Sequence, residues 1–130
     1  MQLTVLVLAA PYTSSGNTTA LQYCRAALAA GHSIYRLFFY GAGVYTATEL
    51  AAPPQGELDL YTEWQTLINT HQLDAVVCIA AALKRGLLDA SESQRYDKNA
   101  YNLAPGFTLG GLGLLTEAAV ISDQLVTFGN

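Results

Sequence analysis

The sequence predicts a single small α/β domain over residues 1–130, with an open, mainly parallel sheet flanked by helices. Apolar, strand-like runs lie near residues 3, 34, 74 and 125, and helical segments separate them. Strands that alternate with helices form parallel sheets with right-handed crossovers. A chain of 130 residues suffices for one buried core, and its clearest break, Pro53–Gly56, is too short to link two domains.

The first strand is expected at Leu3–Ala9, and Pro11 ends it. Asn17 or Thr18 can cap the following helix, which is predicted to run to about Ala30. Its apolar residues recur at spacings of three and four and form a buried stripe: Ala20, Leu21, Cys24, Ala27 and Leu28. Cys24 is therefore interpreted as a core residue.

The middle of the chain continues the alternation. Ile34–Tyr40 is rich in aromatic and β-branched residues, which is typical of a strand. A short helical piece is expected over Val44–Leu50. A longer helix is expected from about Glu57 to His71.

The run Leu73–Ile79 is almost uniformly apolar and predicts a central strand buried on both faces. Ala80–Arg85 is expected to be helical, and Gly86 is placed to end that helix. Cys78 falls where the strand gives way to the helix. In an open parallel sheet this is the carboxyl edge, where ligands and reactive groups collect.

The closing third begins with the most polar part of the chain, Leu88–Asn102, which predicts a surface excursion with one helical turn. Because this excursion follows the Cys78 segment, it could serve as a lid or docking surface. Phe107–Gly113 is expected to lead into a helix that ends near Ser122. Leu125–Phe128 is expected to be the last strand.

Cys78 is the candidate catalytic residue because a thiol reacts as its thiolate, and its position favours the anion. Backbone N–H groups at a helix start and nearby cations both stabilise a thiolate. Lys84 and Arg85 are expected about two turns further along the helix. The alternative is that Cys78 simply fills the core, as free cysteines often do.

The composition narrows the possible functions. A net charge of −4 argues against a broad nucleic-acid-binding face. Charged residues make up 12% of the chain, about half the usual share, which favours oligomerisation. Without a targeting segment or an apolar run long enough for a bilayer, the chain is expected to be cytoplasmic, with Cys24 and Cys78 as free thiols.

Other candidate sites are weaker. Thr13–Thr18 is similar to the phosphate loop of flavodoxins, but an ordinary turn with a helix cap needs the same residues. Gly110–Gly113 lacks the full dinucleotide fingerprint. Neither His32 nor His71 has a cysteine or carboxylate at metal-ligand spacing, so no zinc site is expected.

The residues around Cys78 resemble a known family. Val77–Gly86 is similar to the segment that holds the active cysteine in the DsrE/TusD family of sulfur-relay sulfurtransferases. Phe38–Tyr45 resembles the second strand and following turn of that family. The resemblance covers nearly the whole chain, is closest to the TusD branch, with DsrE of sulfur oxidisers next, and extends to Asn102, Gly106, Phe107, Leu112 and Gly113.

This resemblance implies a DsrE-like fold and a sulfurtransferase in which Cys78 is catalytic, without a metal or organic cofactor. It implies a heterohexamer with two related small subunits, and no direct contact with nucleic acid or membrane. Sulfane sulfur would pass through a Cys78 persulfide from a donor carrier protein to an acceptor, for 2-thiolation of tRNA wobble uridine. DsrE-type relatives act in dissimilatory sulfur oxidation instead. Lys84 stands where relatives often have arginine, which keeps the charge but not the guanidinium fork.

Two alternatives of other classes remain. A flavodoxin-like electron carrier would bind its phosphate at Thr13–Thr18 and would not need Cys78. A non-catalytic assembly subunit is also possible, because related subunits of such complexes can lack the working cysteine. The presence of Cys78 at the matching position argues against this second alternative.

Overall fold

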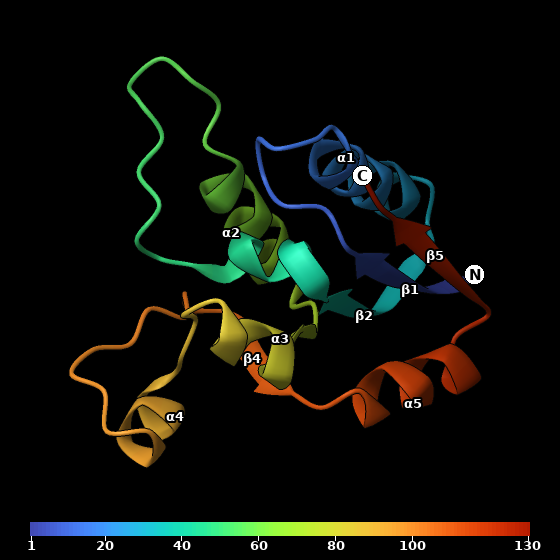
Figure 1. The fold of residues 1–130 in the computed structure, drawn as a ribbon. Coiled ribbons are helices and arrows are strands. Elements are labelled where there is room, and N and C mark those ends of the chain that lie inside the picture. Colours follow the sequence, from blue (N-terminus) through green and yellow to red (C-terminus); the bar gives the residue numbers. More distant parts are fainter.

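A computed structural model describes residues 1–130 and contains one sheet of five parallel strands (Figure 1). The order across the sheet is β4-β3-β2-β1-β5. The strands are β1 (Gln2–Val7), β2 (Ser33–Phe39), β3 (Ala75–Cys78), β4 (Phe107–Gly110) and β5 (Gln124–Phe128). Every pairing is parallel, which confirms the predicted α/β class.

Helices cover both faces of this sheet. Figure 1 shows α1 and α2 on one face and α5 on the other, with α4 standing out at the side of the molecule. The helical elements are α1 (Gly16–Ala29), the 3₁₀ helix η1 (Gly41–Ala47), α2 (Leu60–His71), α3 (Ile79–Lys84), α4 (Ala90–Arg95) and α5 (Gly113–Ile121). None of these helices combines the length and apolar character needed to cross a membrane.

The main core lies between the sheet and the layer of α1 and α2. Phe39 of β2 packs edge-on against Trp64 of α2, with ring centroids 5.3 Å apart, and against Phe107 of β4 at 5.5 Å. Such edge-to-face pairs add to the stabilisation from the buried ring area. Cys24 lies in this core with no exposed surface, so its prediction as a core residue is confirmed.

Asn17 lies inside α1 and does not cap it, so the predicted cap was wrong. The N-cap is Ser15, which makes no capping hydrogen bond through its side chain. The Asn17 side chain is buried; its Nδ2 donates to Ala9 O at 3.0 Å and to Thr46 Oγ1 at 2.9 Å. Its Oδ1 accepts from Trp64 Nε1 at 2.9 Å. A buried amide must have partners, and three distant groups satisfy this one.

The structure corrects the prediction around β3 and β4. Ile79 begins α3 and does not end β3, and β3 is second from an edge, since β2 occupies the centre of the sheet. The sequence prediction also missed β4 (Phe107–Gly110), giving four strands where the structure has five. β4 has only four residues and ends in glycine, so it carries little strand signal of its own. Pairing with β3 along its whole length defines it.

Arg36 of β2 links α5 to the sheet through hydrogen bonds and an ion pair. Its side chain is 10% exposed, with Nε donating to Asp74 Oδ2 at 2.8 Å and Nη1 to both Leu114 O at 2.8 Å and Glu117 Oε1 at 2.9 Å. Burial lowers the pKa of Arg36, but the hydrogen bonds to Asp74 and Glu117 outweigh it and raise that pKa overall. The charged guanidinium therefore holds the first half of α5 against the sheet.

Candidate active site

Cys78 is the last residue of β3 and directly precedes the first turn of α3. Side chains alternate between the two faces of a strand, so Cys78 shares the α5 face of the sheet with Val76. Its neighbour in the register on β4 is Gly110, which has no side chain. The Cys78 thiol therefore lies at the carboxyl edge of the sheet, as the sequence predicted, and Leu114 of α5 packs over the glycine beside it on β4.

A pocket of about 320 Å³ opens at this edge. Cys78 and the first residues of α3 form one wall, and Tyr40 with Gly41, after β2, forms another. Gly111 and Leu112, between β4 and α5, complete the lining on the third side. Three crossover connections thus meet around one thiol, as expected for the carboxyl edge of a parallel sheet.

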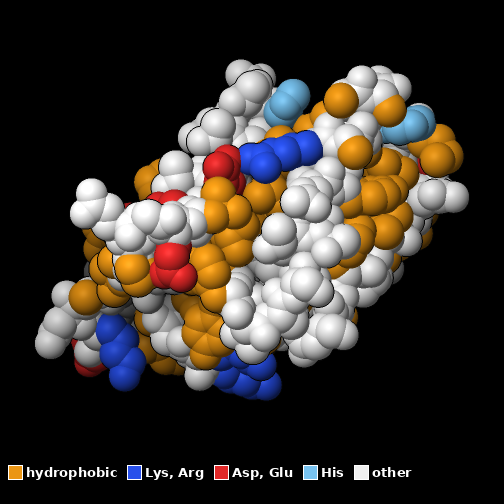
Figure 2. All heavy atoms as spheres, turned by 90° about the horizontal axis from the view of Figure 1, so that it is seen from above, with side chains coloured by type: hydrophobic (Ala, Val, Ile, Leu, Met, Phe, Trp, Pro, Cys, Tyr) orange, Lys and Arg blue, Asp and Glu red, His pale blue; other side chains and the backbone are white.

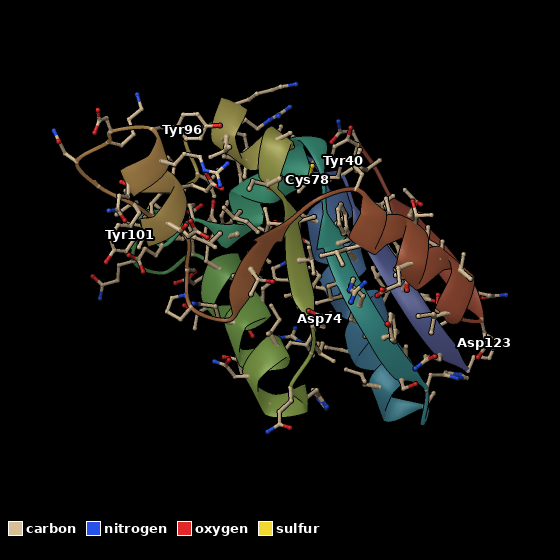
Figure 3. All side chains as sticks on the ribbon, turned by 90° about the horizontal axis from the view of Figure 1, so that it is seen from below. Tyr40, Asp74, Cys78, Tyr96, Tyr101 and Asp123 are labelled. Atoms are coloured by element: carbon tan, nitrogen blue, oxygen red, sulfur yellow. The ribbon has the colours of Figure 1, made fainter.

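The thiol itself is buried in the single chain. Cys78 is 2% exposed, whereas Tyr40 is 37% exposed and Leu112 is 48% exposed. Figure 3 shows Tyr40 beside Cys78 at one end of the sheet, with Asp74 and Asp123 at the opposite end. Tyr40 and Leu112 are therefore more exposed lining residues of a pocket in which the thiol itself is nearly enclosed.

Two cations line the same pocket. Lys84 and Arg85 stand at the end of α3, and neither has a carboxylate within ion-pairing distance. Arg85 Nη1 donates to Ala81 O at 3.1 Å, which folds the guanidinium back over its own helix. The Lys84 side chain makes no hydrogen bond or ion pair within the chain, so its ammonium group can bind an anion in the pocket. The predicted grouping of Cys78, Lys84 and Arg85 is confirmed as a shared lining.

Gly86 and Asn102 fix the chain beyond α3. Gly86 has a φ of 80°, a left-handed conformation that glycine adopts without strain, and it ends α3 as predicted. Asn102 Nδ2 donates to Gly86 O at 3.0 Å, and Asn102 Oδ1 accepts from the N–H of Leu88 at 3.0 Å. These two bonds close the surface excursion of residues 88–102 at its base, so the excursion stays beside α3.

Cys24 lies in a different environment. Burial raises its pKa from 9.0 to about 12, because a thiolate in the apolar core would lack water. None of the pockets in the structure includes Cys24 among its lining residues. The two thiols therefore have different surroundings: Cys24 lies in the closed core, and Cys78 lines a pocket.

The other candidate loops do not form sites of their own. In Thr13–Thr18, Asn17 points into the core, and a Cβ on Gly16 would collide with Gly129 O, so this part of the loop packs against the chain terminus. Within Gly110–Gly113, a Cβ at Gly110 would lie 2.5 Å from Leu114 Cδ1. No group of three or more His, Cys, Asp and Glu side chains is placed to hold a metal ion.

Sequence reasoning did not assign Tyr40, Gly111 or Leu112 to the site. All three line the pocket with Cys78 although they are far from it in sequence. The available signal was topological. Each follows the end of a parallel strand, and such ends share one edge of the sheet.

Fold and site together define a small α/β protein with one buried thiol in a pocket at the carboxyl edge of a parallel sheet. The chain belongs to the DsrE/DsrF-like family, whose family model matches residues 1–128.

Several named proteins are similar in sequence to this chain over nearly its whole length. The chain is 49% identical to the sulfurtransferase TusD homolog of Pseudomonas aeruginosa, over 92% of this chain and 91% of that protein. It is 41% identical to sulfurtransferase TusD of Salmonella newport, over 98% and 100%, and 44% identical to DsrE of Allochromatium vinosum, over 92% of each. These similarities support a sulfur-transfer role for the chain.

A solved structure shows the same fold. The crystal structure of the YchN protein of E. coli superposes with a TM-score of 0.74 and covers 98% of this chain and 100% of that one. At 20% sequence identity, the likeness concerns the fold alone. It confirms the DsrE-like arrangement of a single small domain.

Proposed function

We propose that the chain is a sulfurtransferase subunit of a sulfur relay, in which Cys78 accepts sulfane sulfur from one carrier protein and passes it to another. One observation carries the proposal. The Cys78 thiol at the carboxyl edge lines a pocket with two cations that have no carboxylate partner. This chain is also similar, over nearly its whole length, to proteins named sulfurtransferases. The flavodoxin-like alternative has no comparable support, since Gly16 and Asn17 of the Thr13–Thr18 loop are packed against the rest of the chain.

The transfer consists of two exchanges at sulfur. The Cys78 thiolate attacks the outer sulfur of a donor persulfide, the S–S bond of the donor breaks, and the donor leaves as a thiolate. Cys78 then carries the persulfide, until an acceptor thiolate attacks its outer sulfur and Cys78 leaves as a thiolate. Each step is a thiol–disulfide type of exchange without net oxidation or reduction, so no redox partner is needed.

The pocket suits this chemistry in two ways. Lys84 and Arg85 place positive charge beside the anions that exist before and after each exchange. The pocket also limits contact of the persulfide with water and with stray thiols, because Cys78 is nearly enclosed. Because the thiol is nearly enclosed, part of the pocket lining must move when a donor arrives.

The exposed apolar surface of α5 supports an assembly with related subunits. α5 buries only Ala118 of its nine residues, while Val120 is 80% exposed and Ile121 is 50% exposed. Such a surface is typical of a contact with another protein. We propose the heterohexamer with two related small subunits, tested by co-purification of the three tagged chains and by the mass of the complex.

The end use that we propose is 2-thiolation of tRNA wobble uridine, as the resemblance to TusD implies, with no direct contact between this chain and the RNA. Sulfur oxidation is the second candidate, since DsrE of Allochromatium vinosum is 44% identical. Deleting the gene distinguishes the two. Loss of 2-thiouridine from tRNA supports the first, and loss of growth on reduced sulfur with normal tRNA supports the second.

The decisive experiment is intact mass spectrometry after incubation with a persulfide-loaded carrier protein. The wild type and Cys24→Ser should gain the mass of one sulfur atom, and reductant should remove it. Cys78→Ser should gain none. A gain that follows Cys24, or no gain at all, would point to the non-catalytic assembly subunit.

A further inference from the structure

Three adjacent hollows extend from Cys78 along the carboxyl edge. The pocket at Cys78 shares Lys84 with a second hollow of about 560 Å³, whose lining is Leu83, Lys84, Gly86, Leu88, Tyr96 and Lys98. That hollow shares Gly86 and Leu88 with a third of about 130 Å³, which reaches Leu50 and Tyr101. We call these three hollows together the Cys78 groove.

The Lys and Arg side chains that lack an ion-pair partner all line this groove. The chain has six Lys and Arg residues and a net charge of −4. Two of the six are held elsewhere by carboxylates, Arg25 by Glu63 and Arg36 by Asp74 and Glu117. The other four fall within residues 84–98, and Lys84, Arg85 and Lys98 have no ion-pair partner.

Figure 2 shows Lys and Arg side chains at the lower edge of the face that it draws, and a further group inside that face against an acidic side chain. Arg95, the fourth cation of residues 84–98, lies 3.4 Å from Glu92 on the same helix. An acidic protein that leaves three cations unpaired in one place favours an anionic partner there.

The walls of the groove are apolar and aromatic. Tyr96 is 52% exposed, Tyr101 is 57% exposed and Leu50 is 72% exposed. Figure 3 shows Tyr96 and Tyr101 on the α4 side of the molecule, where α4 projects beside α3. Exposed tyrosines are enriched in protein–protein contacts, and cations beside them add charge complementarity with an acidic partner.

This combination selects a protein partner over a nucleic acid. A nucleic acid carries a phosphate at every nucleotide, so the negative charge of the whole chain would repel it beyond the reach of three cations. A peptide segment with a few carboxylates and some apolar side chains fits both the charges and the walls.

We propose that the Cys78 groove binds an extended acidic segment of a partner protein and directs the sulfur of that segment to Cys78. Lys98 receives one carboxylate in the second hollow, and Lys84 receives another where that hollow meets the Cys78 pocket. Tyr96 and Tyr101 hold its apolar side chains. This inference rests on the proposed function, because it assumes that the partner brings sulfur to Cys78.

The test uses two ten-residue peptides that each carry one cysteine persulfide. One has glutamates and leucines around the cysteine, and the other has glutamines in place of the glutamates. The initial rate of sulfur gain on the full chain is measured by intact mass, and the ratio of acidic to neutral peptide is compared among proteins. The proteins are the wild type, Lys98→Gln, Lys84→Gln and, as the matched control, Arg25→Gln, which removes an equal charge outside the groove.

The ratio should be roughly three- to tenfold higher in the wild type and Arg25→Gln than in either lysine variant, since charge complementarity acts mainly on association. It should also fall toward the value of the variants as salt is raised, because salt screens exposed charges. Comparing ratios between proteins removes any intrinsic difference in reactivity between the peptides. An equal ratio in all four proteins would overturn the proposal. So would inhibition of sulfur gain from the acidic peptide by a short RNA at a lower concentration than by the same peptide without its persulfide.

A small neutral persulfide separates this proposal from the function on which it rests. If it loads Cys78 and neither peptide does, the groove does not admit a protein segment and only the further inference fails. If neither the small persulfide nor any peptide loads Cys78, the catalytic role of Cys78 fails first, and the groove loses its purpose with it.

Discussion

Cys24 and Cys78 are both buried in the same hydrophobic cluster, yet the structure places them in opposite chemical situations. Cys24 is 0% exposed and Cys78 is 2% exposed, so burial does not separate them. Cys24 lies in the closed layer between the sheet and α1, far from any pocket wall. Cys78 lies where β3 ends, with a pocket and two cations beside it.

The two thiols therefore differ in their surroundings and not in their exposed area, because only Cys78 lines a pocket. In the closed layer, a thiolate has no water and no cation, and the pKa of Cys24 rises to about 12. At the carboxyl edge, Cys78 instead lines a pocket that also contains Lys84 and Arg85. The predictions below test this contrast.

The largest expected effect is on alkylation of the two thiols. In native buffer, iodoacetamide should modify Cys78 roughly a hundredfold or more faster than Cys24, because Cys24 requires global unfolding and Cys78 only a local opening. Peptide mapping by mass spectrometry after timed quenching measures both rates. Similar rates, or faster modification of Cys24, would break the comparison.

A substitution at Gly110 tests how tightly Leu114 packs against the end of β4, beside Cys78. In Gly110→Ala, the new Cβ would lie 2.5 Å from Leu114 Cδ1 and 2.9 Å from Val76 Cγ1, so Leu114 must move away from the sheet. We expect a loss of about 1–3 kcal/mol in the free energy of unfolding. Urea denaturation measures it.

Gly111→Ala is the matched control for this substitution. A Cβ at Gly111 meets nothing within 4 Å, so the change should stay within about 0.5 kcal/mol. If the two variants were equally stable, the contact between α5 and the end of β4 would not be tight.

The fold was more predictable than the pocket, for a physical reason. Apolar runs and helical spacing depend on neighbours in sequence, and they gave the class, α1, α2, and the place of Cys78 at the end of a strand. The strand β4 and the buried Asn17 depend on partners far away in the chain, such as β3 and Trp64. Tyr40 and Leu112 joined the site only because two other crossovers end at the same edge.

The alkaline stability of the protein tests the Cys24 side of the comparison. The folded-state pKa of about 12 lies above the ordinary thiol value of 9.0, so the unfolded chain loses this proton first as the pH rises. The contribution is therefore fully present below pH 9 and is lost between pH 9 and about 12. By linkage, the free energy of unfolding should fall by about 1.4 kcal/mol more between pH 8 and 10 in the wild type than in Cys24→Ala.

Urea denaturation under reducing conditions at the two pH values measures this difference. Comparing the fall within each protein removes the constant effect of the cavity that Cys24→Ala leaves. An equal fall in both proteins would mean that the core admits water to Cys24.

The smallest expected effect concerns Tyr40, an exposed side chain in the lining of the Cys78 pocket. The backbone N–H of Tyr40 donates to Val7 O at 3.0 Å, so Tyr40→Ala should remove the ring while leaving the chain in place. Alkylation of Cys78 should then accelerate roughly three- to tenfold, because less local opening is needed. Tyr45→Ala is the control, since Tyr45 is similarly exposed, at 40%, but does not line the pocket. An unchanged rate in Tyr40→Ala, with acceleration in Leu112→Ala, would assign the control of access to Cys78 to the residue before α5 and make α5 the element that must yield when a donor arrives.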